Sequence, residues 1–406
     1  EVTMTDFLQS GSIATLHDFS NRTSESLEQD LRSWSKSRPM SIIIPCLVSE
    51  LERPALSNIV TQLRGADYIS EIIIGLDQAN PEQFREAKKF FSVLPQKTKI
   101  IWNDGPAVSS ISESLCNHFS SAAAPGKGRN VWHCLGYFLG SGQGEIVALH
   151  DADIVTYDGS LLTRLLYPVA HPTFDYSFAK GFYYRATESH FGGRLVRLLT
   201  SPLIDALTQC HGSSDYLNYL RSFKYPLAGE FALSKELASR ISMPSDWGLE
   251  IGVLSEIYRL SERQNICQVA ITSRYDHKHQ PLSADNSNLG LHKMSRDILQ
   301  TILSGLAANN ALITREDLTS IGAAYRHNAH EAINRYANDS EINGFKYNRE
   351  DEQLAATLFE KCFIEEGEKH LNGQRSLRSM PDWLQIENTL PGTLVQLYSA
   401  IEIDNQ

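Results

Sequence analysis

The sequence predicts an α/β protein with a mixed central sheet and a helical C-terminal extension. Strand-like and helix-like segments alternate through residues 39–153, which is the pattern of parallel strands joined by helices. An aromatic segment with alternating character follows at 174–185 and predicts an antiparallel strand. From residue 287 onward, helix follows helix with little glycine or proline. A chain of 406 residues has room for one large domain with such an extension.

The first half contains four predicted strands, which are separated by turn residues and predicted helices. The strands are rich in β-branched residues and lack a polar–apolar alternation, which indicates burial on both faces of the sheet. A polar, serine-rich segment precedes them and includes a short predicted helix at 23–35. The predicted strands lie at 41–45, 69–76, 99–102 and 146–149, and the predicted helices lie at 55–64, 81–93 and 130–139.

The second half has a different pattern, because its strands no longer alternate regularly with helices. After the aromatic strand, the sequence predicts helices at 195–208 and 231–240. An apolar run at 266–272 predicts the last strand. The sheet therefore combines parallel and antiparallel strands.

The composition argues against several classes of protein. A formal charge of −11 argues against general nucleic-acid binding, which needs a basic face. The six cysteines include no C-x-x-C pair, which favours reduced thiols in a cytoplasmic protein over disulfides or a zinc site. No run approaches the roughly 20 apolar residues of a membrane span, and the first residues lack a signal-peptide pattern.

Two aspartates follow the predicted strand at 146–149. Side chains two residues apart on an extended chain point the same way, so Asp151 and Asp153 can converge on one cation. They would do so at the carboxyl end of a strand, where open α/β sheets bind their ligands. Hard oxygen ligands suit Mg²⁺ or Mn²⁺, and these ions suit a diphosphate. By itself, such a pair of carboxylates is more often part of a turn.

Other polar residues are predicted at the same edge of the sheet. Asp77 ends the second strand and suits a nucleoside base or ribose, although a simple turn explains it equally well. Ser49 and Glu50 follow the first strand, where the first loop of such folds meets a nucleotide, but a solvated loop would look the same. Lys127 in Pro125-Gly-Lys-Gly128 offers a cation for a phosphate or sugar hydroxyl. That motif lacks the Walker A spacing and is more often an ordinary turn.

A pair of arginines beside paired glycines opens the predicted helix at 195–208. Arginine binds phosphate and carboxylate through two parallel bonds, and helix N-termini favour anions. Arg194 and Arg197, three residues apart, therefore form a candidate anion site. An exposed, solvated pair is the alternative, and we favour that alternative for Arg197.

Three further groups complete the candidate site. Glu230 ends the compact turn Tyr225-Pro-Leu-Ala-Gly-Glu230, which allows a carboxylate to approach a ligand. Glu250 can point into the same cleft. His277 follows the last predicted strand and can add a ligand to the cation held by Asp153, although the H-x-H pattern also suits zinc.

In this order and spacing, the motifs resemble those of metal-dependent glycosyltransferases of the GT-A type, whose nucleotide-binding half is Rossmann-like. More narrowly, they resemble the glucosyl-3-phosphoglycerate synthases and their mannosyl relatives, which are retaining enzymes. No single motif is specific. The landmarks between Ile42 and Leu282 are Pro45, Pro125-Gly-Lys-Gly128, Asp151-Ala-Asp153, Gly193-Arg194, Pro226-Leu-Ala-Gly-Glu230, Gly248-Leu-Glu-Ile-Gly252 and His277.

The resemblance implies a donor site and a metal site. Asp153 and His277 would ligate a Mg²⁺ or Mn²⁺ ion. The first loop departs from the family, which more often has an Asn-Glu pair there. The donor would be bound by Pro45, Cys46, Leu47, Ser49, Glu50, Asp77, Lys127 and Asp151.

The resemblance also implies an acceptor site. Gly193, Arg194 and Val196 would hold the phosphate or carboxylate of the acceptor. Val196 stands where the family carries a small hydroxyl residue, so the acceptor can differ from 3-phosphoglycerate. The catalytic groups that contact the transferred sugar and the acceptor would be Leu227, through its carbonyl, Glu230 and Glu250.

The implied reaction moves a hexose from a UDP-, GDP- or ADP-sugar to a small anionic acceptor such as 3-phosphoglycerate or glycerate. The leaving phosphate would deprotonate the acceptor hydroxyl on the same face of the sugar. Three alternatives stay open: an inverting, family-two-like transferase with Asp246 as the nearest base, a nucleotidyltransferase, and a non-catalytic sugar-nucleotide-binding protein. The resemblance implies a homodimer.

Three regions are expected along the chain. Residues 1–38 would form an N-terminal lead-in. Residues 39–285 would form the GT-A catalytic domain, with a donor-binding half at 39–153 and an acceptor-binding half at 154–285. Residues 286–406 would form a helical region that covers the acceptor site or builds a dimer interface.

Overall fold

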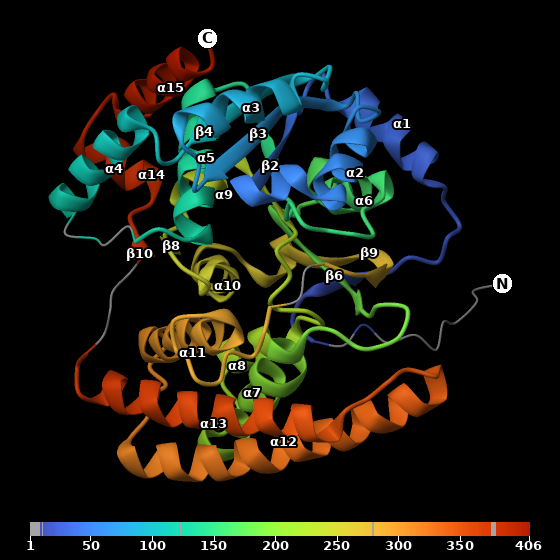
Figure 1. Ribbon diagram of the computed structural model, residues 1–406, viewed down its shortest axis with the longest axis vertical. Coiled ribbons are helices and arrows are strands. Elements are labelled where there is room, and N and C mark those ends of the chain that lie inside the picture. The colour runs from blue at the N-terminus through green and yellow to red at the C-terminus, as the bar shows by residue number, and fades with distance from the viewer. Residues whose placement is uncertain (1–8, 10, 120, 122–123, 278–279, 375–378) are drawn as a thin grey trace.

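A computed structural model of the protein describes residues 9, 11–119, 121, 124–277, 280–374 and 379–406. Its centre is an eight-stranded mixed sheet with the strand order β1-β9-β6-β7-β5-β2-β3-β4, flanked by helices (Figure 1). The strands of this sheet are β1 (Ala14–Leu16), β2 (Met40–Leu47), β3 (Ile69–Asp77), β4 (Lys97–Trp102), β5 (Ile146–Leu149), β6 (Phe178–Arg185), β7 (Phe231–Ser234) and β9 (Ile266–Tyr275).

The first half of the chain forms the predicted parallel units. Strands β5, β2, β3 and β4 pair in parallel in that order. Ile43 and Ile73 join one hydrophobic cluster, whereas Ile42, Ile44 and Ile72 join the other, so these strands are buried on both faces as predicted. The helices α2 (Pro54–Leu63), α3 (Pro81–Phe91) and α5 (Lys127–Ser141) match predicted helices, and α4 (Pro106–Phe119) is an additional one.

The predicted helix at 231–240 is wrong in its first part. Residues Phe231–Ser234 form β7, which lies antiparallel between β5 and β6. Only α9 (Lys235–Arg240) is helical, and it begins where the side chain of Ser234 accepts a hydrogen bond from the backbone N–H of Leu237. Alanine and leucine favour a helix, but backbone pairing with two neighbouring strands overrides that preference here.

Two other elements differ from their predicted form. Strand β6 is antiparallel to β7, as expected, but it is also parallel to β9. The predicted helix at 195–208 begins as a π-helical segment (Leu195–Thr200) and continues as α7 (Ser201–His211). Segments of this kind are rare and frequently lie at functional sites.

The N-terminal segment contributes to the same fold. Strand β1 pairs in parallel with β9 and forms one edge of the sheet. Helix α1 (Ser24–Trp34) contacts α6 (Gly159–Ala170), and the side chain of Thr23 caps its first turn. The segment at 1–38 therefore supplies an edge strand to the sheet in its described part.

The C-terminal region has two parts that lie at opposite ends of the molecule (Figure 1). Helices α11 (Gly290–Ala308), α12 (Arg315–Asn343) and α13 (Arg349–Leu371) pack beside α7 and α10 (Leu249–Leu260). Helix α15 (Thr393–Asp404) packs against α4, α5 and β4, and Trp383 of α14 (Trp383–Thr389) stacks on Trp132 of α5 with ring centroids 4.4 Å apart. Between the two parts, β10 (Ser379–Met380) pairs with β8 (Met243–Pro244).

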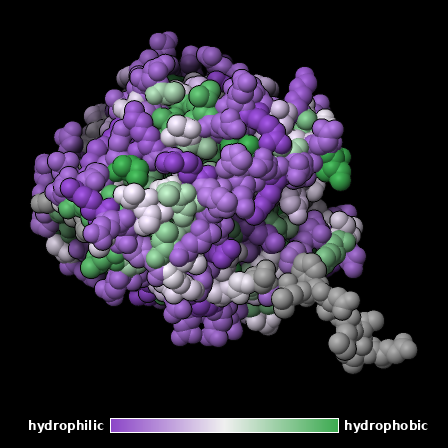
Figure 2. Space-filling model, turned by 90° about the horizontal axis from the view of Figure 1, so that it is seen from below, coloured by the Kyte–Doolittle hydropathy of each residue, from purple (hydrophilic) through white to green (hydrophobic). Residues whose placement is uncertain are grey.

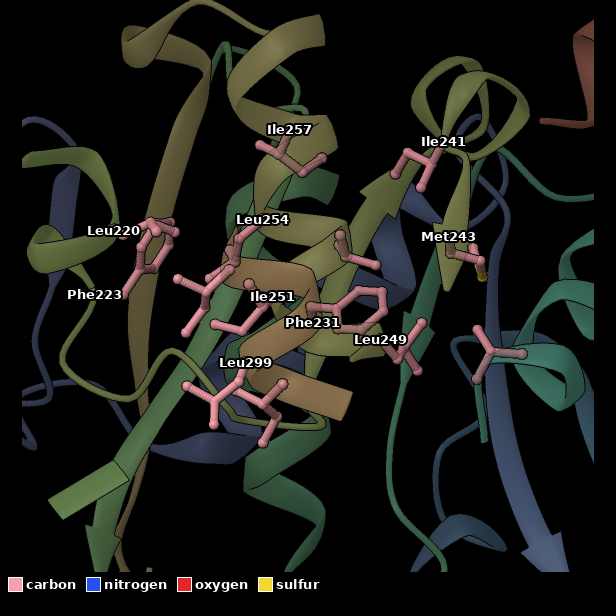
Figure 3. Packing of buried hydrophobic residues seen from close by; sticks show 14 of the residues in the cluster. Leu220, Phe223, Phe231, Ile241, Met243, Leu249, Ile251, Leu254, Ile257 and Leu299 are labelled. Carbon is pink, nitrogen blue, oxygen red and sulfur yellow. The ribbon is translucent and has the colours of Figure 1, made fainter. Parts of the chain in front are cut away.

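Apolar side chains of α10 join the sheet to the C-terminal helices. Leu249, Ile251 and Leu254 of this helix lie in one buried cluster with Phe231 of β7 and Leu299 of α11 (Figure 3). Seen from the end that carries α12 and α13, the surface is largely hydrophilic, with hydrophobic residues in small groups (Figure 2). Within the described part of the chain, no helix combines the length and apolar character that crossing a membrane requires.

Candidate active site

The carboxyl ends of the parallel strands open onto a cavity of about 330 Å³. The ends of β2 and β3, the N-terminus of α5 and the loop after β5 contribute to its walls. Open α/β sheets bind their ligands at this edge. The cavity brings together most of the predicted donor and metal residues, namely Pro45, Cys46, Leu47, Glu50, Asp77, Lys127, Asp151, Asp153 and His277.

Ser49 is the one predicted donor residue that does not line this cavity. It lies exposed in the 3₁₀ helix Val48–Glu52. The sequence reasoning missed other lining residues. Arg129 and Asn130 could have been found from their position two and three residues after Lys127 on the same helix, whereas no signal in the sequence pointed to Trp247, Gln280 or Met294.

Asp153 and His277 form the candidate metal pair. Oδ2 of Asp153 lies 3.6 Å from Nδ1 of His277, and that nitrogen has no hydrogen-bond partner among the described residues. Burial opposes ionisation of Asp153, but His277 and Lys127 outweigh it and lower the pKa of the carboxyl below its ordinary value. The described residues include no group of three His, Cys, Asp or Glu side chains arranged around a cation. A cation here would therefore need further ligands from a bound substrate or water.

Lys127 links the two halves of the site through ion pairs. Its Nζ lies 2.6 Å from Oδ1 of Asp151 and 2.8 Å from Oε1 of Glu250. Burial opposes the charge of Lys127, but the two carboxylates outweigh it and raise the pKa of the ammonium above its ordinary value. The lysine therefore stays protonated and lines the cavity between two carboxylates.

The glycines around Lys127 serve close packing of the backbone. A β-carbon at Gly128 would collide with the carbonyl of Pro244, and one at Gly126 would collide with the carbonyl of Ser245. The backbone N–H of Arg129 also donates to the Ser245 carbonyl at 3.1 Å. The first turn of α5 therefore lies directly against the segment after β8, and this contact brings Lys127 to Glu250.

Asp77 is held in place by amide groups. Its two carboxylate oxygens accept hydrogen bonds of 2.9 Å each, one from Nδ2 of Asn103 and one from Nδ2 of Asn130. Behind them, Oδ1 of Asn103 lies 2.8 Å from Nδ1 of His133. Burial raises the pKa of Asp77, and the two amides act against that rise. The carboxylate thus has a defined orientation at the carboxyl end of β3.

The predicted catalytic carboxylates do not line the cavity. Glu230 is fully buried, and its Oε1 accepts a 2.6 Å hydrogen bond from the hydroxyl of Tyr275. Burial and the neighbouring Asp151 raise the pKa of Glu230 to about 7. Glu250 reaches the site through its ion pair with Lys127, and Leu227 is half-buried in the turn before Glu230.

A second cavity, of about 260 Å³, adjoins the first. It is lined by Gly193 and Arg194, as predicted, and also by Arg185, which the sequence reasoning missed although it ends the alternating strand β6. Val196 is buried and does not line it. The residues shared by the two cavities are His277, Gln280 and Met294.

The preference for an exposed Arg197 is wrong. This side chain is buried, and it donates from Nη1 to Oε2 of Glu352 at 2.8 Å and from Nε to the carbonyl of Gly192 at 2.7 Å. Arg194 donates from Nε to Oε1 of the same glutamate at 2.7 Å. Glu352 belongs to α13, which packs against the π-helical segment Leu195–Thr200. Nothing in the local sequence signals a partner so far along the chain.

Comparison with known proteins identifies the family. No protein-family model matches the chain. The chain is 38% identical over 402 residues to a glucosyl-3-phosphoglycerate synthase of Persephonella marina, and the match covers 99% of each protein. The chain belongs to the glucosyl-3-phosphoglycerate synthase family. Another member, from Methanococcoides burtonii, is 35% identical over 97% of this chain and 96% of its own length. The protein described here is therefore a glycosyltransferase, which confirms the predicted class of enzyme.

Solved structures confirm the predicted GT-A fold. Glucosyl-3-phosphoglycerate synthase of Mycobacterium tuberculosis, in complex with Mn²⁺, UDP-glucose and phosphoglyceric acid, has a TM-score of 0.54 and 21% identity. That match covers 73% of this chain and 89% of the other. Mannosyl-3-phosphoglycerate synthase of Rubrobacter xylanophilus has a TM-score of 0.54 and 19% identity, over 74% of this chain and 83% of the other.

Proposed function

We propose that this glycosyltransferase moves glucose from UDP-glucose to 3-phosphoglycerate and retains the configuration of the anomeric carbon. The observation that carries this proposal is the junction of the two cavities at His277. One cavity offers carboxylates and a lysine for a metal-bound diphosphate, and the other offers arginine for an anionic acceptor. The tuberculosis relative binds both of these substrates together with Mn²⁺.

Asp153 and His277 fit the proposed cation. Among the described residues, the imidazole nitrogen has no hydrogen-bond partner. It faces a carboxylate oxygen at 3.6 Å, which is too far for a hydrogen bond and leaves both atoms able to act as ligands. When bound, Mg²⁺ or Mn²⁺ would neutralise charge that develops on the departing nucleoside diphosphate. Two protein ligands suit an ion that completes its shell with phosphate oxygens.

The donor is held by groups that line the larger cavity. Asp77, oriented by its two amides, is placed to accept hydrogen bonds from the nucleoside, beside the walls formed by Pro45 and Leu47. Lys127 supplies the positive charge beside the diphosphate and the sugar. Burial raises the pKa of the Cys46 thiol, so this group stays protonated. Cys46 therefore lines the cavity and does not act as a nucleophile.

The proposed retaining reaction uses the leaving phosphate as the base for the acceptor hydroxyl. Neither Glu230 nor Glu250 lines a cavity, so their roles would be indirect: Glu250 would position Lys127 for the hydroxyls of the transferred glucose and the acceptor, and Glu230 would support the site from the core beside Asp151. The Leu227 carbonyl would support the sugar. Asp246 is a poor base for an inverting reaction, because it lines neither cavity and its Oδ1 accepts a 2.9 Å bond from the backbone N–H of Gly248. This geometry favours the retaining mechanism.

The acceptor binds in the smaller cavity. Gly193, in the left-handed region at φ 70°, brings its backbone beside Arg194, and a β-carbon there would crowd the hydroxyl of Tyr225. Arg194 and Arg185 supply the positive charge for phosphate and carboxylate. Val196 does not reach the cavity with its side chain, so its lack of a hydroxyl removes no contact.

The proposal is tested by a panel of substrates. UDP-, GDP- and ADP-glucose and GDP-mannose are each incubated with 3-phosphoglycerate or glycerate, with Mg²⁺, Mn²⁺ or EDTA. We expect the fastest transfer from UDP-glucose to 3-phosphoglycerate, no transfer in EDTA, and an α-linked product by NMR. A β-linked product would support the inverting alternative, and transfer to glycerate alone would overturn the acceptor.

We also propose that the enzyme works as a homodimer in the cytoplasm. All six cysteines are free thiols, which fits a reducing compartment. Ile342 of α12 and Leu354 of α13 are exposed and apolar, so they offer contacts to a second copy. Light scattering should give twice the mass of one chain, and the mass of a single chain would contradict the dimer.

A further inference from the structure

Glu352 is a buried carboxylate that joins two arginines beside the smaller cavity. It is only 4% exposed, and each of its oxygens accepts one charge-assisted hydrogen bond, from Arg194 and from Arg197. A buried carboxylate without such partners would be strongly unfavourable. With two guanidinium groups and one carboxylate, the cluster keeps a net positive charge next to the cavity.

The two arginines have different roles in this cluster. Arg197 is 6% exposed, bonds the carbonyl of Gly192 as well as Glu352, and lies 4.7 Å from the ring of Tyr336. Arg197 therefore holds the carboxylate of Glu352 in place. The side chain of Arg194 is 32% exposed and lines the cavity.

The hydrogen bonds of Arg194 leave its two terminal nitrogens, Nη1 and Nη2, available to bind a ligand. Glu352 accepts from Nε, and no described residue accepts from Nη1 or Nη2. A guanidinium carries five N–H donors in one rigid plane. When Nε is fixed from behind, the orientation of the remaining donors is fixed too, and a phosphate or carboxylate can bind them in a bidentate manner.

We propose that Glu352 is a positioning residue for the acceptor site. Through Nε it orients Arg194, while Arg197, which itself packs against Tyr336, holds Glu352. Helix α13 of the C-terminal region thus completes a site built mainly on the GT-A domain. This inference rests on the proposed function, because it takes the smaller cavity as the acceptor site. The alternative is that Glu352 competes with the acceptor anion for Arg194, and the two roles predict opposite effects.

The test compares Glu352→Ala with the wild-type enzyme in steady-state kinetics. We expect the KM for 3-phosphoglycerate to rise about tenfold, the scale on which loss of a supporting hydrogen bond weakens a ligand-holding side chain. The KM for UDP-glucose should stay the same. A lower or unchanged acceptor KM would overturn the proposal, and a lower one would establish competition. Glu360→Ala is the matched control, because Glu360 also lies on α13 and pairs with an arginine, Arg326, which lines neither cavity.

A double-mutant cycle separates positioning from a general structural effect. If Glu352 acts through Arg194, then Glu352→Ala adds no further rise in acceptor KM when Arg194 is already alanine. Additive effects would contradict this role. Removal of Glu352 leaves Arg197 buried without a carboxylate, so Glu352→Gln is measured as well. The glutamine keeps one oxygen for Nε of Arg194 and should recover part of the lost affinity.

Binding of 3-phosphoglycerate, measured by calorimetry, distinguishes failure of this inference from failure of the proposed function. If the wild-type enzyme binds 3-phosphoglycerate without transferring glucose to it, the proposed function fails, and the effect of Glu352→Ala on the Kd still decides the role of Glu352. If the wild-type enzyme does not bind 3-phosphoglycerate, both proposals fail.

Discussion

Asp153 and His277 lie on two loops that are joined by their backbones. Ile154 and His277 form an isolated antiparallel bridge, and the backbone N–H of Val155 donates to the carbonyl of Asp276 at 2.8 Å. The loop after β5 is therefore tied to the loop after β9. The distance of 3.6 Å between the carboxylate and the imidazole is set by this pairing, so the proposed metal ligands are arranged before any ion binds.

The first prediction concerns these two residues. We expect Asp153→Ala and His277→Ala each to lower metal-dependent transfer by about 100-fold or more, because each removes a proposed ligand of the ion that neutralises the leaving diphosphate. Thermal unfolding without metal should change little. Binding of Mn²⁺ in the presence of UDP, measured by electron paramagnetic resonance, should weaken in parallel. Full activity of Asp153→Ala with Mg²⁺ would show that the metal assignment is wrong.

Arg194 carries the second prediction. We expect Arg194→Ala to raise the KM for 3-phosphoglycerate about 10- to 100-fold, as loss of a charge-assisted hydrogen bond of about 1.5–3 kcal/mol predicts. The KM for UDP-glucose should stay constant, because the donor occupies the other cavity. Arg194→Lys should recover only part of the affinity, since lysine lacks the planar fork. An unchanged acceptor KM in the alanine variant would rule out this role.

The pattern of residues predicted the parallel strands and the edge of the sheet that carries the site. Four β-branched runs separated by helices left few other arrangements, and Asp77 and Asp151 follow directly from the strand ends. The position of His277 after the last predicted strand made it a candidate ligand beside Asp153, and the resemblance to a family implied the same role. The contact itself depends on pairing between distant loops, which no local pattern contains.

The two wrong predictions, the helix at 231–234 and the exposure of Arg197, have a common physical cause. Residues 231–234 favour a helix locally, but they become a strand because β5 and β6 offer backbone partners on both sides. The sequence around Arg197 is typical of an exposed residue, and its ion pair with Glu352 of α13 explains why it can be buried. In both cases the deciding partner comes from another part of the chain, so no local pattern contains it.

The third prediction is a pH dependence of stability that arises from Glu230. Burial and Asp151 raise the pKa of this carboxyl from 4.5 to about 7. A carboxyl with a raised pKa stabilises the folded state below its unfolded pKa, and the contribution is lost as the pH rises through the folded pKa. The shift corresponds to about 3 kcal/mol.

Urea unfolding in EDTA can measure this loss. Glu230→Gln resembles the protonated form at every pH, so it serves as the reference. Relative to this variant, the wild-type protein should lose about 3 kcal/mol of unfolding free energy between about pH 4.5 and pH 8. A difference between the two proteins that does not change with pH would mean that Glu230 titrates normally.

The fourth prediction concerns Gly229, which lies against Asp151. A β-carbon at this position would collide with the carboxylate of Asp151, which is ion-paired to Lys127 at 2.6 Å. The backbone of Gly229 is not in the left-handed region, so its conformation is compatible with alanine. The collision with Asp151 is therefore the obstacle to alanine at this position. We expect Gly229→Ala to displace Asp151 and to destabilise the fold by about 1–3 kcal/mol, as other overpacked sites do.

The effect of Gly229→Ala on activity should exceed its effect on stability. A displacement of about 1 Å at a reacting site can lower the rate by as much as 100-fold, so kcat/KM should fall at least tenfold, while the Tm falls by only a few degrees. Gly159→Ala is the matched control: its β-carbon would meet only Oε1 of Gln62, at 3.7 Å, and both stability and activity should stay close to wild type. Equal activity of the two variants would show that the position of Asp151 does not limit the reaction.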